Sequence, residues 1–277
     1  MRLLRLETRR ARRRARRAVV GLALVGLIAV LLGRSPAGQA LFGCGLLGLV
    51  LLESLQLRRA LEENARQQYA LTQIRPLAGE LPLDFSEWAA DPLLVYQAVR
   101  LILETRPSLV LECGSGSSTV VLARCLRAIG QGRLLSLDHD AEYAGRTSGL
   151  LRLYGLDDRA TVVCAPLVSR AAGDEVFRWY GPEYQPFLHE PIDLLLVDGP
   201  PGGSAVRARY PAVPLLRAHL SADCVILLDD GDRPDERAIA QAWARDLGAT
   251  LSYLRGGRGG WLLRRPVGTS SATRSGS

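Results

Sequence analysis

The clearest chemical signal in this sequence is an apolar run that leads into a glycine-serine turn, in the segment LVLECGSGSST at residues 109–119. Gly114 and Gly116 allow the backbone to pass close to a ligand, and the N–H groups of such a turn suit a carboxylate or phosphate. Asp138 ends the next apolar run, where it can accept hydrogen bonds from both hydroxyls of a ribose. This spacing predicts a nucleotide-type cofactor pocket; the alternative is a tight turn and a capping acid with no ligand.

Three further acids follow two later apolar runs. Asp198 ends the run DLLLVD at residues 193–198, and Asp229 with Asp230 ends VILLDD at residues 225–230. If both runs are parallel strands, their carboxyl ends meet at one sheet edge, so the three carboxylates converge beside the cofactor pocket. Unneutralised carboxylates at close range repel one another, and a hard divalent cation such as Mg²⁺ relieves that repulsion. The pattern predicts a metal site of Asp198, Asp229 and Asp230.

Charge and cysteine usage exclude several other functions. The 277 residues carry a net charge of +7, but residues 1–17 hold nine arginines and one glutamate, so the remainder of the chain sums to about −1. The basic excess therefore lies in one tail, and we expect no nucleic-acid partner. The five cysteines show no C-x-x-C spacing, which argues against a zinc site or a disulfide framework.

Two apolar runs near the N-terminus, Ala18–Gly33 and Ala40–Leu52, flank a polar turn at residues 34–39. They predict a two-helix membrane hairpin, although sixteen helical residues span ~24 Å against a hydrocarbon core of ~30 Å. Arginines precede the first run and follow the second, so both ends should face the cytoplasm, most simply at a bacterial inner membrane. The alternatives are a buried helical pair, a cleaved signal peptide or an organelle transit peptide.

The pattern divides the chain into five parts. These are an arginine-rich cytoplasmic tail (1–17), the membrane hairpin (18–53), a helical stalk or linker (54–83), a catalytic domain (84–267) and a disordered tail (268–277). The stalk helix is expected over residues 53–75 and is ended by Pro76; an ordinary solvated helix packed on the domain fits the same pattern.

From residue 84 onward, short apolar runs alternate with helical stretches, which predicts an α/β fold: a Rossmann-like, doubly wound sheet, mostly parallel with a closing antiparallel strand. Asp91 and Pro92 should open the first helix. The expected strands are 108–113, 133–138, 160–164, 192–197, 224–228, 250–254 and 261–264. The expected helices are 91–106, 119–129, 141–154, 212–220 and 236–247.

The glycine turn, the run Leu137-Asp138-His139-Asp140 and the segment 193–201 together resemble the class I S-adenosylmethionine-dependent methyltransferases. The resemblance covers roughly residues 84–266. It implies that the glycine turn holds the methionine part of the cofactor, that Glu112 supports this region and that Asp138 binds the ribose. The cofactor-binding residues that it implies are Glu112, Gly114, Ser115, Gly116, Ser117, Ser118, Asp138, His139 and Asp198.

The three convergent acids are similar to the site of the metal-dependent O-methyltransferases of catechols and sugars. That resemblance implies Mg²⁺ or another divalent cation that lowers the pKa of an acceptor hydroxyl and orients it. The catechol enzymes have an asparagine where this chain has Asp230, and a lysine base where this chain has no lysine at all. We therefore assign catalysis to Asp198, Asp229 and His139, with His189 and His219 as further candidate bases. For each of the three histidines a structural role is the favoured alternative.

Other residues near these motifs admit two interpretations each. The pocket mouth could be covered, or an anionic group bound, by Arg207, Arg209 and Tyr210. For Arg207, a solvated charge on a surface loop is the favoured interpretation. The aromatic residues after the third strand could form a lid, contact adenine or pack in the surface. They are Phe177, Trp179, Tyr180 and Tyr184.

The sequence thus predicts a membrane-anchored methyltransferase that acts on an oxygen of a small-molecule, glycan or lipid-linked acceptor, and that could form a homo-oligomer. Two alternatives remain open: a catalytically silent scaffold with the same fold, and a nicotinamide-dependent oxidoreductase. The missing third glycine, Glu112 and the Asp229-Asp230 pair argue against the oxidoreductase. A hydrolase is weakly supported, since no Gly-x-Ser-x-Gly segment is present.

Overall fold

The computed structural model describes residues 18–21, 24–28, 36–78 and 90–265 of the chain. It contains two units, residues 1–66 and 67–277, which we describe separately. The predicted arginine tail, the C-terminal tail 268–277 and the start of the catalytic domain at residue 84 lie outside the described residues.

The long helix α2 spans Pro36–Ala78; its residues 36–66 form most of the described part of the first unit, and its residues 67–78 belong to the second. The predicted polar turn at residues 34–39 is corrected for its described part, because α2 begins at Pro36; the helix then continues through the second apolar run and the predicted helical stalk without a break. A proline fits the first turn of a helix, where its missing N–H costs no hydrogen bond, and Pro76 lies only in the last turn. Among the described residues, α2 alone is long and apolar enough to cross a membrane, judged by length and composition. The described parts of the first apolar run, 18–21 and 24–28, are also helical, but they do not establish a hairpin.

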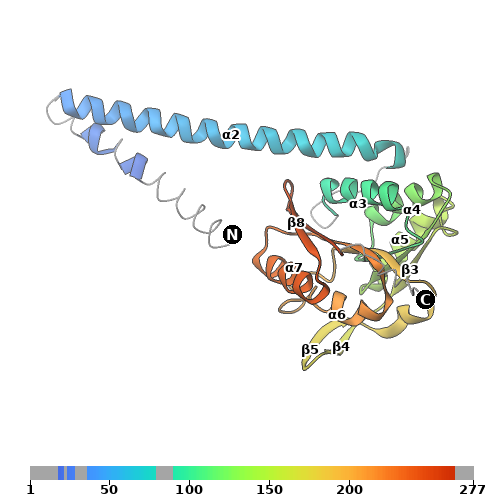
Figure 1. Ribbon diagram of the computed structural model, residues 1–277. Coiled ribbons are helices and arrows are strands. Elements are labelled where there is room, and N and C mark those ends of the chain that lie inside the picture. The colour runs from blue at the N-terminus through green and yellow to red at the C-terminus, as the bar shows by residue number, and fades with distance from the viewer. Residues whose placement is uncertain (1–17, 22–23, 29–35, 79–89, 266–277) are drawn as a thin grey trace, which may run out of the picture. The chain divides into compact units, whose positions relative to one another are not determined.

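The second unit contains a seven-stranded sheet (Figure 1). Its strand order is β3-β2-β1-β6-β7-β9-β8; the first five strands are parallel, and β9 runs antiparallel to both β7 and β8. The bounds are β1 (Leu109–Cys113), β2 (Arg133–Asp138), β3 (Ala160–Cys164), β6 (Ile192–Val197), β7 (Leu220–Leu228), β8 (Thr250–Leu254) and β9 (Gly260–Arg264). The predicted parallel sheet with a closing antiparallel strand is confirmed.

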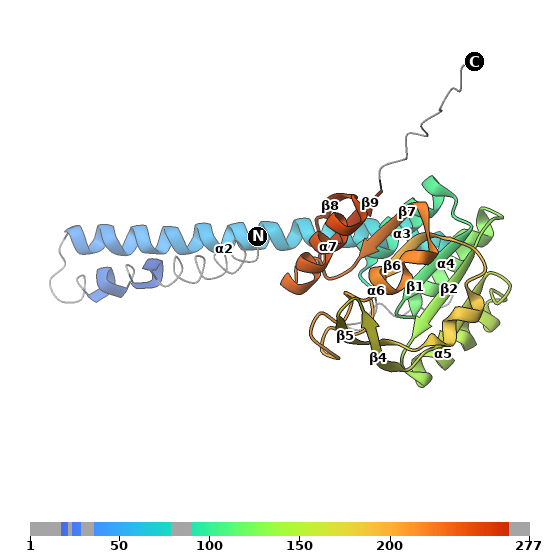
Figure 2. The same ribbon diagram turned by 60° about the horizontal axis from the view of Figure 1, so that its bottom comes forward.

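Helices cover both faces of this sheet (Figure 2). One face carries α3 (Pro92–Thr105), α4 (Ser117–Ala128) and α5 (Ala141–Leu153), and the other carries α6 (Ala212–Leu216), the short 3₁₀ helix Arg217–His219 and α7 (Pro234–Leu247). Alternate residues of each strand enter opposite cores: Val110 packs with α3 and α4, whereas Leu109 and Leu111 pack with the α6 and α7 side. This alternation is the pleat of a strand buried on both faces.

The sequence did not reveal a small hairpin between β3 and β6. Strand β4 (Leu167–Ala172) pairs antiparallel with β5 (Glu175–Tyr180), and the 3₁₀ helix Pro182–Phe187 follows. Trp179, Tyr180 and Tyr184 are buried in the α7-side core, so the structure assigns these aromatic side chains to packing rather than to a lid.

Candidate functional site

The glycine turn follows β1 at the carboxyl edge of the sheet, and its two glycines have different functions. Gly114 has φ +98°, and a Cβ there would lie 3.3 Å from the backbone nitrogen of Gly199. Its own N–H donates to the carbonyl of Leu137 at 2.8 Å. Gly114 is therefore required by the close approach of two loops and by a left-handed backbone.

Gly116, in contrast, has an open face. Within the described residues, and apart from its two chain neighbours, no atom lies within 4 Å of a Cβ built at this position. Its N–H donates to the Oγ1 of Thr119 at 2.9 Å, which fixes the entry of the chain into α4. A ligand can therefore approach the backbone at Gly116 without displacing protein atoms.

Glu112 supports this turn from the protein interior. It is fully buried and accepts hydrogen bonds from the hydroxyls of Ser118 at 2.6 Å, Thr119 at 2.6 Å and Ser136 at 2.7 Å. Burial raises the pKa of Glu112, and the three hydroxyl donors oppose that shift. In the structure Glu112 and Ser118 thus point into the protein and position the turn, and Ser117 is also buried.

Asp138 lies opposite the glycine turn at the end of β2. Its Oδ2 accepts from the backbone N–H of Ser115 at 3.0 Å and from the Ser115 hydroxyl at 2.6 Å. Its Oδ1 accepts from the N–H of Asp140 at 3.1 Å and lies 3.5 Å from Nδ1 of His139. The structure therefore brings Ser115, Asp138 and the partly exposed His139 together, as the cofactor prediction required.

The three acids predicted to converge also meet. Asp198 follows β6, and Asp229 and Asp230 follow β7; carboxylate oxygens of all three lie within 4.8 Å of one another. The Asp198 side chain is 19% exposed, whereas those of Asp229 and Asp230 are 1% and 4% exposed. Asp198 is therefore the member of this carboxylate cluster that is most open to solvent.

Arg209 lies inside the cluster, with its side chain only 3% exposed. It donates to the carboxylates of Asp230 at 2.9 Å and Asp198 at 3.3 Å. It also donates to the backbone carbonyls of Asp198, Asp229 and Pro200, at 2.6, 3.2 and 3.4 Å. Its expected place at the pocket mouth is corrected: Arg209 is a buried counter-ion of the acids.

Two arginines that the sequence analysis did not single out complete this arrangement. Arg258, in the turn between β8 and β9, lies 3.1 Å from Asp229 and 3.4 Å from Asp230. Arg233, just before α7, lies 2.9 Å from Asp230 and 3.8 Å from the buried Glu236. The Asp-Asp-Gly-Asp-Arg run and the arginine within the glycine-rich turn are the sequence signals that could have indicated them.

Burial also changes the acid chemistry of the cluster. The pKa of Asp229 is raised well above its ordinary value, first by burial and then by the negative charges of Asp198 and Asp230. Burial raises the pKa of Asp198 as well, although Arg209 opposes the shift. The two carboxyl groups lie close together, so this pair retains a proton more readily than free carboxylates do.

The fit of Mg²⁺ to this cluster can be tested on its donor set. Three carboxylates within reach of one another are the oxygen ligands that Mg²⁺ prefers. However, each of the three already faces at least one guanidinium group, and Asp230 faces three. A dication there would displace these pairs or lie beside their positive charges, so the residues present do not fit a resident divalent cation.

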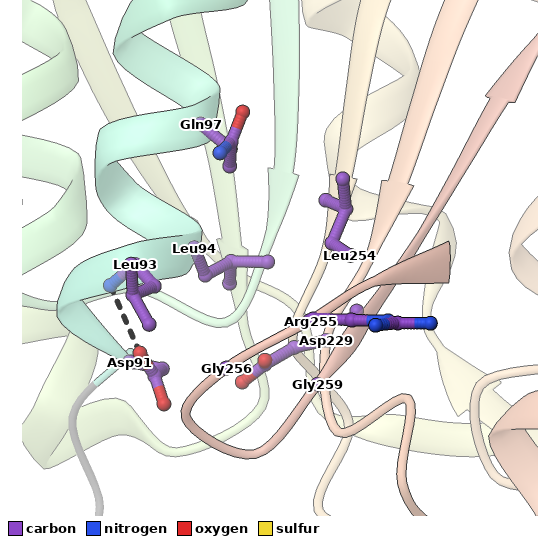
Figure 3. Close-up of a pocket in the computed structure, with 10 residues that line it drawn as sticks. Asp91, Leu93, Leu94, Gln97, Asp229, Leu254, Arg255, Gly256 and Gly259 are labelled. Atoms are coloured by element: carbon purple, nitrogen blue, oxygen red, sulfur yellow. Dashed lines mark hydrogen bonds between the residues drawn. The ribbon is translucent and has the colours of Figure 1, made fainter. Parts of the chain in front are cut away.

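A pocket opens between the start of α3 and the β8–β9 turn (Figure 3). Leu93, Leu94 and Leu254 give it apolar walls, and Gln97 and Asp229 contribute polar groups. The predicted N-cap Asp91 forms one end of the pocket. Its carboxylate accepts from the N–H groups of Leu93 and Arg258, both at 2.9 Å.

The three candidate base histidines are distributed over both sheet edges. His139 directly follows β2 at the carboxyl edge. His189 precedes β6, and His219 immediately precedes β7, so both lie at the amino ends of parallel strands. The proposal of His189 and His219 as bases is therefore corrected, because the amino ends of parallel strands face away from the glycine turn and the acids.

Comparisons with known proteins agree with this geometry. Residues 111–231 match the family model of a methyltransferase domain. Among solved structures, the fold is similar to an SAH-bound methyltransferase from Podospora anserina, with a TM-score of 0.51, 16% identity, and coverage of 72% of this chain and 88% of that one. It is also similar to a candidate caffeoyl-CoA O-methyltransferase from Staphylococcus aureus, with a TM-score of 0.51, 12% identity, and coverage of 76% and 100%. The sequence matches none of the curated proteins.

Proposed function

We propose that this chain, which carries a class I methyltransferase domain at residues 111–231, transfers the methyl group of S-adenosylmethionine to an oxygen of its acceptor. The observation that carries this proposal is the open backbone face of Gly116 beside Asp138, within the segment that matches the methyltransferase model. A turn of this kind can receive a ligand without rearrangement, and the acid next to it can bind a ribose.

The residues of the glycine turn would hold the cofactor. The backbone of Ser115 and Gly116 would contact its methionine part, and Asp138 with His139 would lie on the ribose side. Glu112 would keep the turn in place through Ser118 and Thr119. When bound, S-adenosylmethionine supplies an electrophilic methyl group on a sulfonium sulfur.

The acceptor would lie on the Asp198 and Asp229 side of the same edge. Asp198 is the most exposed carboxyl group of the cluster and lies beside Asp229, so it is our choice for the group that accepts the hydroxyl proton. The pocket with walls of Leu93, Leu94 and Leu254 would receive an apolar part of the acceptor. The Mg²⁺ expected from the sequence is not part of this proposal, because the carboxylates are already paired with arginines.

We further propose that helix α2 anchors the enzyme to a membrane. Five large apolar side chains in or just after its apolar half are between 51% and 60% exposed, namely Leu46, Leu47, Val50, Leu51 and Leu55. Such surface is stable in lipid and costly in water. A Cβ added at Gly48 would lie 3.0 Å from Val19, a close approach that supports the hairpin.

Membrane attachment favours a glycan-precursor or lipid-linked acceptor, since it confines enzyme and substrate to one surface. With the arginine tail on the cytoplasmic side, the methyltransferase domain would face the cytosol. Radiolabelled S-adenosylmethionine added to membranes that contain the enzyme would distinguish acceptor classes: a lipid-linked product enters the organic phase, and a small polar product stays in the aqueous phase.

The cofactor is tested by calorimetric titration of S-adenosylmethionine into the full chain in mild detergent, with NADH as the comparison ligand. We expect micromolar binding of S-adenosylmethionine and none of NADH. Gly116→Val should abolish that binding, whereas Gly149→Val should not, because Gly149 also has open space at its Cβ but belongs to α5 and not to the turn. If the folded chain binds neither ligand, a silent scaffold is the better interpretation.

A further inference from the structure

We propose that Arg209, Arg233 and Arg258 take the place of the divalent cation in this site, so that the carboxylate cluster works without a metal ion. The three guanidinium groups come from three separate segments: the loop after β6, the loop before α7 and the β8–β9 turn. Together they pair with Asp198, Asp229 and Asp230, and each of these acids has at least one arginine nitrogen within 3.3 Å.

Arg209 cannot leave this arrangement without loss of stability. Its side chain is almost fully buried, and it donates to three backbone carbonyls besides two carboxylates. Those carbonyls belong to residues 198, 200 and 229, at the ends of β6 and β7. Arg209 therefore joins the two strand ends that a bound cation would otherwise join.

Arg258 also has a fixed position, because hydrogen bonds to Asp91 and to residues 231–232 hold the backbone of its turn. Its N–H donates to Asp91 at 2.9 Å, and its carbonyl accepts from the N–H of Asp232 at 3.0 Å. The N–H of Gly231 donates to the carbonyl of Gly259 at 2.7 Å. The backbone thus presents the Arg258 guanidinium to Asp229 and Asp230 as a built feature of the fold.

Two glycines show how closely the turn is packed. A Cβ at Gly257 would lie 1.8 Å from a carboxylate oxygen of Asp91, and a Cβ at Gly231 would lie 2.8 Å from the backbone of Gly260. The turn is therefore packed closely against Asp91 and against residues 231–232, which hold Arg258 beside the carboxylates. Guanidinium groups contact both oxygens of Asp230 and one oxygen each of Asp198 and Asp229, and so compete with Mg²⁺ for these ligands.

This inference rests on the proposed function for one consequence only: methyl transfer should proceed in the presence of a chelator. Arg258 would then supply the positive charge beside Asp229 at the wall of the acceptor pocket. The absence of a cation site itself can be tested without turnover and without knowledge of the acceptor.

The test is a titration of the full chain with Mn²⁺, monitored by the electron paramagnetic resonance signal of free Mn²⁺. We expect no binding by the wild type at millimolar Mn²⁺. Arg258→Met frees one guanidinium site on Asp229 and Asp230 and should raise Mn²⁺ affinity by about tenfold or more. Arg255→Met removes the same charge from an exposed position of the same turn and should leave the titration unchanged.

The wild-type titration decides the matter even if Arg258→Met does not fold, which circular dichroism would show. Stoichiometric binding of one Mn²⁺ by the wild type, lost in Asp230→Asn, would overturn the inference. A folded Arg258→Met variant with no gain in Mn²⁺ affinity would also contradict it. Parallel titration with S-adenosylmethionine keeps the two questions apart, because its binding tests the proposed function alone.

Discussion

Two neighbouring regions at the carboxyl edge of the sheet are stabilised in opposite ways. We call the glycine turn the first corner and the carboxylate cluster the second corner. At the glycine turn, uncharged hydroxyl and backbone N–H groups bond to Glu112 and Asp138, and one face of Gly116 stays open. At the carboxylate cluster, charges from distant segments are buried against one another around Arg209. The first corner is thus prepared for a ligand, whereas in the second the charged groups depend on one another for stability.

The largest effect is expected when the second corner loses its central charge. Arg209→Met leaves two carboxylates and three carbonyls without their buried donor, which should cost about 3–5 kcal/mol in the free energy of unfolding. Urea unfolding monitored by tryptophan fluorescence measures this, because Trp243 donates to the carbonyl of Tyr210 next to Arg209. Arg207→Met is the control: Arg207 pairs with the exposed Glu175, so that change should cost ~0–1 kcal/mol. Equal losses in the two variants would show that the buried charge of Arg209 does not stabilise the second corner more than an exposed ion pair does.

The next prediction separates the two glycines of the first corner. Gly114→Ala combines a strained φ with a 3.3 Å approach to Gly199, and should cost about 1–3 kcal/mol. Gly116→Ala meets no protein atom, so it should cost less than about 1 kcal/mol while it weakens S-adenosylmethionine binding. Thermal unfolding and calorimetry of both variants check this. A large stability loss in Gly116→Ala would show that the open face serves the fold.

A pH series tests whether the buried Glu112 at the glycine turn holds its proton more tightly in the folded state than in the unfolded state. Burial raises the pKa of Glu112 above its unfolded value, so the folded state holds the proton more tightly. Stability from this group is full below about pH 4, near the unfolded pKa, and is lost as pH rises through the folded pKa. Glu112→Gln cannot ionise, so its stability relative to wild type should increase with pH over that range. A pH-independent difference in urea unfolding would contradict the raised pKa.

A smaller effect is expected at His139, which lies beside Asp138 and is partly exposed. His139→Ala should weaken S-adenosylmethionine binding by roughly threefold, within the range of one modest contact. His189→Ala, at the opposite sheet edge, should leave the affinity unchanged. Calorimetric titration of both variants decides, and identical affinities would exclude His139 from the cofactor site.

The smallest effect that we predict is none. If arginines neutralise the carboxylate cluster, EDTA should change neither the melting temperature of the wild type nor its affinity for S-adenosylmethionine. A stabilising metal would shift the melting temperature by mass action. A drop in melting temperature with EDTA that added Mg²⁺ reverses would therefore indicate a resident cation.

The same contrast explains what the sequence could predict. The sheet followed from its alternating apolar runs, and the cofactor corner from the adjacent residues 109–119 and from Asp138. Convergence of the three acids followed from the parallel strands alone. Their arginine partners were not predicted, although Arg233 lies three residues from Asp230 and Arg209 eleven residues from Asp198, because the sequence alone does not show which arginine side chains are buried beside the acids.

Two parts of the fold were also missed for physical reasons. The β4–β5 hairpin lies largely at the surface, with Val168 and Val176 exposed, so its strands lack the strong apolar contrast of the central sheet. The break predicted before α2 relied on Pro36 as a turn residue, although a proline also suits the first turn of a helix. In both cases the local signal was compatible with more than one structure.

The packing of the β8–β9 turn also determines where this protein can be engineered. Surface turns are the usual place to insert a tag or a fluorescent reporter. The turn at residues 255–259 is unsuitable, because Asp91 and Asp232 hold its backbone and Gly257 has no room for even one added carbon. The turn between β4 and β5 has open space at Gly173, so a reporter placed there should leave the catalytic domain intact.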